Sequence, residues 1–154
     1  MCKLGDIIVI DEFKDGFGKK VKRHSFVVIN DEGNYIQGLK YDFVCNMLCS
    51  FHNEEHKIIK ISYKSNLEIT ENDITIKNGN NKKGYIKANQ LYYFNKNNIK
   101  YYLIGKINQT MLDKLYRLIT KLVIERKDKE IITNLEINKK GGHYEEKKYY
   151  SKIT

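Results

Sequence analysis

The feature that most constrains the fold is a series of short apolar runs separated by turn residues, followed late in the chain by one helical repeat. The runs are rich in β-branched and aromatic residues, which is typical of strands. We expect strands within the ranges 4–13, 24–30, 35–39, 41–51, 57–63, 73–77, 85–95 and 99–107. Gly33 and Asn34 can adopt the positive φ values of a tight hairpin turn. The glycine- and lysine-rich segments 14–23 and 78–84 are expected to be loops, the first of them exposed and mobile.

Apolar residues recur at helical period through 108–127, where Thr110 followed by Asp113 is similar to a capping box. The apolar stripe comprises Met111, Leu112, Leu115, Leu118, Ile119, Leu122 and Val123. Such a stripe is most simply the face that packs on a sheet. The predicted fold class is therefore mainly β with α: a small, strongly curved, barrel-like antiparallel sheet with a C-terminal helix packed on it.

A chain of 154 residues is most simply one domain, which we expect at 1–127. Residues 128–154 are expected to be a polar, basic extension, and a disordered arm, a short hairpin or a partner-binding arm all remain open. The three cysteines include no CxxC pair, which fits a reducing compartment. Because no apolar run approaches the ~20 residues of a membrane helix, we expect a cytoplasmic protein without a membrane partner.

The segment His52-Asn53-Glu54-Glu55-His56 matches H-x-x-E-H, the signature of inverted zinc peptidases. That site needs both histidines on one helix face and a third ligand, for which Glu68 and Glu71 are the candidates. The motif lies between two expected strands, and nothing in the sequence marks either glutamate. A zinc hydrolase is therefore the weakest of the alternatives, and we expect no metal and no cofactor.

A net charge of +9 favours a polyanionic partner. RNA carries its own nucleophile, the 2′-hydroxyl, so an enzyme without a metal can cut it with a histidine, a cation and a hydroxyl. His24, Ser50 and His52 occur at the ends of expected strands, close to the basic segment 14–23. Residues 80–108 contain six lysines, no acidic residue and six interleaved rings, as in proteins that bind single-stranded RNA. The lysines are Lys82, Lys83, Lys87, Lys96, Lys100 and Lys106, and the rings are Tyr85, Tyr92, Tyr93, Phe94, Tyr101 and Tyr102.

The runs "GDIIVID", "KRHSFVVIN" and 84–119 resemble the MazF/PemK-type toxins in order and spacing, over roughly residues 3–124. The resemblance implies a compact barrel-like sheet and metal-independent, sequence-specific RNA cleavage that leaves a 2′,3′-cyclic phosphate and a 5′-hydroxyl. The arginine typical of the family falls on His24, one residue after Arg23, and its Thr-Ser dipeptide falls on Cys49-Ser50. In the ToxN/CptN-like branch the basic residue that follows would fall on His52. The predicted catalytic set is Ser50, His52, His24, Arg23 and Cys49, and the predicted RNA-binding set is Lys19, Lys20, Lys22, Lys82, Lys83 and Lys87.

The resemblance also implies a cognate antitoxin, either a folded repeat RNA or a small acidic protein. The basic charge and the similarity to the ToxN/CptN-like branch favour the RNA, and an oligomer, with itself or with antitoxin RNA, is left open. A non-catalytic RNA-binding module, or a gyrase-poisoning toxin of the same fold, is the alternative from a different class.

Overall fold

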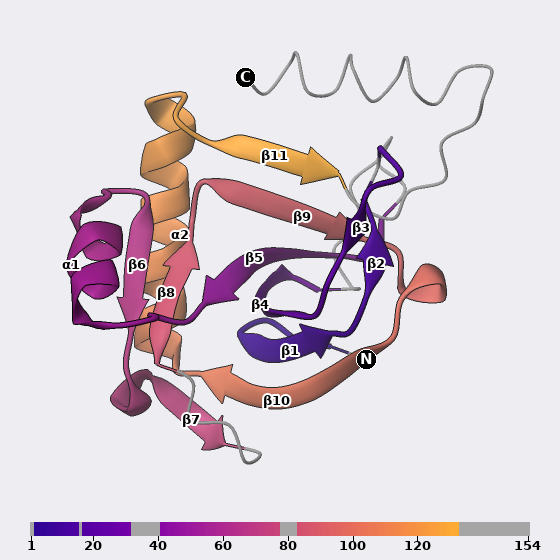
Figure 1. Ribbon diagram of the computed structural model, residues 1–154, viewed down its shortest axis with the longest axis horizontal. Coiled ribbons are helices and arrows are strands. Elements are labelled where there is room, and N and C mark those ends of the chain that lie inside the picture. The colour runs from indigo at the N-terminus through magenta and orange to yellow at the C-terminus, as the bar shows by residue number, and fades with distance from the viewer. Residues whose placement is uncertain (1, 16, 32–40, 78–82, 133–154) are drawn as a thin grey trace.

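A strongly curled, mainly antiparallel sheet of nine strands dominates the computed structural model, which describes residues 2–15, 17–31, 41–77 and 83–132 (Figure 1). The strands of this sheet run in the order β11-β9-β5-β4-β1-β10-β7, and β8 joins β5 to β6 beside this row. Their bounds are β1 Asp6–Ile10, β4 His24–Asn30, β5 Phe43–Cys49, β6 Asn66–Ile69, β7 Ile74–Lys77, β8 Gly84–Lys87, β9 Gln90–Phe94, β10 Tyr101–Ile107 and β11 Lys129–Ile132. The two α-helices are α1 Glu54–Ser62 and α2 Gln109–Ile124, and single 3₁₀ turns occupy Glu71–Asp73 and Lys96–Asn98. The predicted fold class is confirmed.

The sheet curls because its central strands contain bulges and because β5 pairs with two different strands on the same side. Register shifts interrupt the ladders between Ile7 and Ile8 in β1 and between Val28 and Asn30 in β4, and such bulges bend a strand and increase its twist. The first half of β5 pairs with β9 and its last two residues pair with β8. The sheet therefore divides into two arms along β5.

Asn46 holds the two arms together at the point of division. Its side chain is fully buried, and Nδ2 donates to the carbonyl oxygens of Lys87, at the end of β8, and Gln90, at the start of β9, over 3.0 and 2.8 Å. These carbonyls flank the turn between the two strands, where a β-ladder cannot supply a partner. A buried amide N–H group needs an acceptor, and these two hydrogen bonds fix where β5 changes partner.

Alternate residues of the strands supply two apolar layers, one on each face of the sheet. Ile7, Val27 and Leu48 face α2, whereas Ile8, Phe26 and Cys45 face the interior of the curl. Met111, Leu112, Leu115 and Leu122 of α2 are buried against the first layer. The prediction that the apolar stripe of α2 packs on the sheet is thus confirmed, although Val123 at the end of the stripe is 49% exposed.

Several sequence expectations are wrong in detail. The expected strand 57–63 is the helix α1, which begins after Asn53, whose side chain accepts from the backbone N–H of His56. That cap and the acidic first turn outweigh the β-branched residues, because α1 lies on the surface beside β6 and buries no side chain of its own. The N-cap of α2 is Asn108, not Thr110, since the side chain of Asn108 accepts from the N–H of Met111.

Other differences concern the edges of the sheet. A small hairpin of β2 (Phe13–Lys14) and β3 (Lys20–Val21) overlaps the expected loop 14–23. The strand β6 was not expected, and β11, from the extension after residue 127, adds a parallel strand beside β9. The hairpin expected around Gly33 and most of the loop 78–84 lie outside the described residues.

Candidate functional site

Three neighbouring strands bring His24, Cys49 and Tyr85 into one row at an end of the sheet. Ser25 of β4 lies opposite Leu48 of β5, and continuing this antiparallel register by one residue places His24 opposite Cys49. On its other side Cys49 lies directly opposite Tyr85 of β8. Directly opposed residues share a face of a sheet, so the three side chains leave the sheet on the same side as Phe26 in the curled interior.

Tyr85 anchors the row and supports an aromatic surface. Burial, followed by the charge of Cys49 and a hydrogen bond to it, raises the pKa of the Tyr85 phenol to about 12. All three causes favour the neutral hydroxyl, and the hydrogen bond joins this phenol to Cys49. The ring of Phe51 stacks on Tyr85 with 5.3 Å between centroids and 28° between planes. Phe51 is half-buried, so this surface lies partly open to solvent.

Close backbone approach brings β8 to this end of β5. A Cβ added to Gly84 would overlap the carbonyl oxygen of Cys49 and lie 3.3 Å from Cα of Ser50. Only glycine permits this distance between the strands. Gly84 therefore determines how near Tyr85 lies to Cys49 and Ser50.

The start of α1 brings two further histidines to the same region. The backbone N–H of His52 donates to Nδ1 of His56 over 3.2 Å, and the two rings lie 4.4 Å apart. The ring of His56 is also 6.3 Å from Tyr85 and 6.4 Å from Phe51. Partial desolvation, then the neighbouring His52 and Lys60, lower the pKa of His56.

Contacts with the backbone give His24 a defined protonation pattern. Its Nδ1 lies 2.7 Å from the carbonyl oxygen of Lys22. A carbonyl only accepts hydrogen bonds, so Nδ1 carries a proton and Nε2 bears the lone pair when the ring is neutral. The ring of His24 can therefore accept a proton at Nε2.

Ser50 and His52 follow the end of β5, and both are exposed. The strand stops at Cys49, so the alternation of a strand does not place Ser50 and His52 on one face. Instead the turn that leads into α1 carries both side chains. Cys49 itself is half-buried in the row described above.

The predicted cations form two groups. Lys19, Lys20, Lys22 and Arg23 are exposed on or beside the β2–β3 hairpin. Arg23 pairs with Asp11 at 3.3 Å and Lys20 with Glu12 at 3.2 Å. Exposed pairs of this kind contribute about 0–1 kcal/mol, so a phosphate can replace the carboxylate at little cost.

The second group of cations lies on β8 and just before it. Lys83 is exposed and pairs with Glu71 at 3.2 Å, while Lys87 is half-buried at the end of β8. Lys82 lies outside the described residues.

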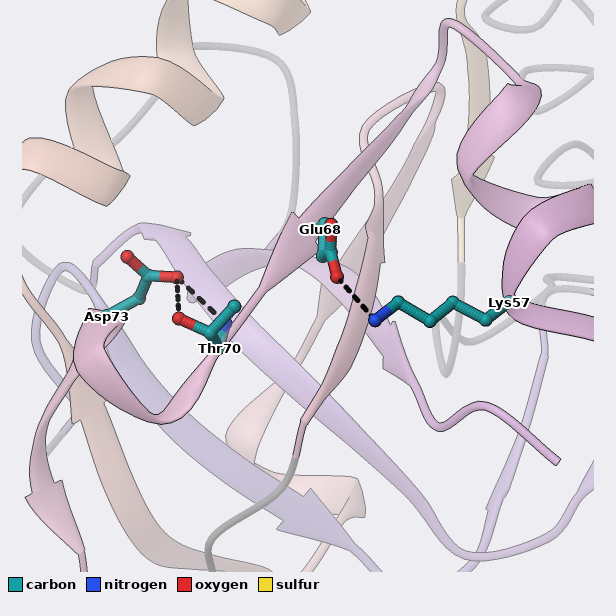
Figure 2. Close-up of polar contacts among 4 residues, drawn as sticks. All are labelled: Lys57, Glu68, Thr70 and Asp73. Carbon is teal, nitrogen blue, oxygen red and sulfur yellow. Dashed lines mark hydrogen bonds and ion pairs between the residues drawn. The ribbon is translucent and has the colours of Figure 1, made fainter. Parts of the chain in front are cut away.

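The zinc interpretation gains no third ligand from the two nominated glutamates. Figure 2 shows Lys57 of α1 extending to Glu68 of β6, with 3.3 Å between Nζ and Oε1. Figure 2 also shows Asp73 accepting from Thr70 at the turn after β6. Glu71 belongs to the same turn and pairs with Lys83. Within the described ranges, no group of three or more His, Cys, Asp and Glu side chains is arranged to hold a metal ion. The Lys57–Glu68 pair instead ties α1 to β6 one residue after His56.

Sequence reasoning missed the contributions of Phe51 and His56 to this region. Neither Phe51 nor the second histidine of H-x-x-E-H was among the predicted site residues. The available signal was the Asn53-Glu54-Glu55 sequence, which is typical of a helix start and would have placed His52 and His56 on one turn.

No protein-family model matches this sequence, and a search of curated proteins finds no match. In the part of the chain that the structure describes, no helix is long and apolar enough to cross a membrane.

Proposed function

We propose that this protein is a metal-independent endoribonuclease, the toxin of a toxin–antitoxin pair. The observation that carries the proposal is that β4 begins at His24 beside the end of β5, the strand that Ser50 and the His52–His56 turn directly follow. Imidazoles exchange protons near neutral pH, and exposed lysines attract a phosphate backbone. The resemblance to MazF/PemK-type toxins supports the same reaction.

In the proposed reaction, Nε2 of His24 takes the proton from the 2′-hydroxyl as its oxygen attacks the adjacent phosphorus. The bond from phosphorus to the 5′-oxygen breaks, and a protonated His52 gives its proton to that oxygen. The products are a 2′,3′-cyclic phosphate and a 5′-hydroxyl, and solvent returns one proton to His52 and removes one from His24. Ser50 donates to a non-bridging oxygen, while Arg23 and the hairpin lysines neutralise neighbouring phosphates.

The test is incubation of the purified protein with a mixed-sequence RNA in EDTA, followed by mapping of the ends. We expect discrete fragments with 5′-hydroxyl ends. Ser50→Ala, His52→Ala and His24→Ala should each lower the rate at least roughly tenfold, because general acid–base groups contribute about 10²–10⁴. Ser62→Ala is the matched control, since Ser62 is an exposed serine at the end of α1.

Intact RNA, with a cooperative thermal transition showing that the protein is folded, would refute the nuclease. Retention of RNA without scission would instead favour the binding module, and cleavage abolished by EDTA would favour a metal hydrolase. For the partner we propose a folded repeat RNA, supported by the +9 charge. A short tandem-repeat array beside the gene is the expected finding, and a small acidic reading frame in its place would overturn the RNA partner.

A further inference from the structure

The turn from His52 to His56 constrains the protonation of His56. Nδ1 of His56 accepts the backbone N–H of His52 over 3.2 Å. A ring nitrogen that accepts a hydrogen bond carries no proton, so in the neutral ring the proton is on Nε2. His24 has the opposite arrangement, with the proton on Nδ1 towards the carbonyl of Lys22. The protein backbone thus assigns different tautomers to two histidines of the same region.

The charges around His56 favour its neutral form. Desolvation, followed by the charges of His52 on the same turn and Lys60 on the same helix, lowers the pKa of His56. Lys57 follows it directly and is paired with Glu68 of β6. Glu54 and Glu55 are exposed in the first helical turn, and the neighbouring group on β8 is the neutral phenol of Tyr85.

We propose that His56, as a neutral imidazole, donates its Nε2–H to a non-bridging oxygen of the scissile phosphate. The inference rests on the proposed RNA cleavage and adds a binding group to it. The centroid distance of 4.4 Å between the rings of His52 and His56 lets one phosphate reach both. His52 then exchanges a proton with the leaving oxygen, and His56 supplies a hydrogen bond that strengthens as negative charge develops on the phosphorane.

A neutral donor suits this position for a chemical reason. Its Nε2–H remains bound to nitrogen throughout the reaction, so its contribution does not depend on the proton balance of His24 and His52. The hydrogen bond from the His52 amide fixes the ring at its opposite nitrogen, so the donor is oriented before RNA binds. In this proposal the H-x-x-E-H segment is a turn that carries two imidazoles with different tasks. His52 exchanges a proton with the substrate, whereas His56 keeps its proton and only donates a hydrogen bond.

Two substitutions at residue 56 separate the structural contact from the proposed contact with RNA. His56→Asn places an acceptor near the position of Nδ1, which preserves the turn, but has no group at the position of Nε2. His56→Gln carries an amide N–H near the position of Nε2. We expect His56→Asn to lower the cleavage rate roughly 10- to 100-fold, the loss typical of one hydrogen bond to a charged oxygen. We expect His56→Gln to remain within about fivefold of the wild type, by the same comparison of hydrogen-bond strengths, and to keep the shape of the wild-type pH–rate profile.

The outcomes differ for the alternatives. Equal loss in both variants, or loss of one limb of the pH profile in His56→Gln, would mean that His56 transfers a proton and would overturn the proposal. Wild-type rates in both variants would mean that His56 does not touch the substrate, which also overturns it. Circular dichroism melts of both variants check that the turn is preserved.

A binding measurement separates failure of this proposal from failure of the nuclease itself. A single-stranded 2′-O-methyl RNA lacks the attacking hydroxyl, so its affinity can be measured whether or not the protein cleaves RNA. We expect His56→Asn to weaken this affinity several-fold more than His56→Gln. Equal affinities for the two variants would overturn the contact, whereas an intact difference with no cleavage would refute only the nuclease.

Discussion

Replacing Gly84 by alanine should destabilise the fold and displace the candidate site at once. The new Cβ would overlap the carbonyl oxygen of Cys49 and lie 2.9 Å from its carbonyl carbon. Carbon atoms that are not bonded to each other prefer about 3.5–4.0 Å. Both neighbours are backbone atoms, so no side-chain rotation can relieve the overlap, and β8 must move away from β5.

The magnitude follows from what that movement breaks. Overpacking of a well-packed region costs about 1–3 kcal/mol. Weakening the short ladder that joins Leu48 to Ile86 and Cys49 to Tyr85 adds about 1 kcal/mol for each of roughly two backbone hydrogen bonds. The expected loss is therefore about 3–5 kcal/mol, which corresponds to roughly 6–20 °C in Tm for a chain of this length.

The assay is a thermal melt followed by circular dichroism, with Gly18→Ala as the control. Gly18 has a φ of +81° and nothing within 4 Å of an added Cβ. Its substitution therefore carries only backbone strain, about 1 kcal/mol, and a decrease of roughly 2–4 °C. If Gly84→Ala melts no lower than Gly18→Ala, the close contact between β8 and β5 is wrong, and with it the row from His24 to Tyr85.

Three further predictions test other parts of the structure. Asn46→Ala should cost about 2–4 kcal/mol in urea unfolding, because the carbonyls of Lys87 and Gln90 lose a buried donor; a loss below about 1 kcal/mol, the net value of one ordinary hydrogen bond, would contradict this. Asn108→Ala should cost about 1 kcal/mol in the same assay through loss of the N-cap of α2, and no change would mean that another group caps the helix. The pKa of Tyr85 is raised to about 12 in the folded protein, so its neutral form contributes stability that is complete below the unfolded pKa of ~10 and is lost as pH rises towards 12. Tyr85→Phe should therefore lose less stability than the wild type across this interval, and identical alkaline melting curves would refute the shift.

The elements that sequence predicts well are those whose signal is local. The apolar run at 24–30 matches β4 at both ends, and the helical stripe after residue 108 matches α2 to within a few residues. In both, the burial pattern agrees with local propensity. In α1 two local signals conflict. Ile58, Ile59 and Ile61 favour a strand, whereas Asn53 and the two glutamates after it favour the start of a helix. The helix forms on the surface, where Ile58 and Ile59 remain exposed, so apolar content was a poor guide there.

The candidate site was predictable in its members more than in its arrangement. His24, Ser50 and His52 were expected at strand ends; the structure puts His24 at the start of β4 and the other two after the end of β5. The order of the row, the hydrogen bond between Tyr85 and Cys49 and the pairing of His52 with His56 depend on contacts that residue spacing does not specify. Ser50 and His52 belong to no strand, because β5 ends before either residue.

The sequence alone determines the mainly β composition, the C-terminal amphipathic helix, the basic charge and the residue types available for proton transfer. Each depends on residues within a few positions of one another, or on totals that no fold can alter. Tertiary structure alone decided that β5 divides between β8 and β9 at Asn46, that Gly84 lets β8 approach Cys49, and that Lys129–Ile132 adds a parallel strand. The physical reason is that strands pair through backbone N–H and C=O groups, which are alike in almost every residue and therefore do not specify a partner strand. Burial and packing across the whole chain therefore select one register from many that the local sequence would allow.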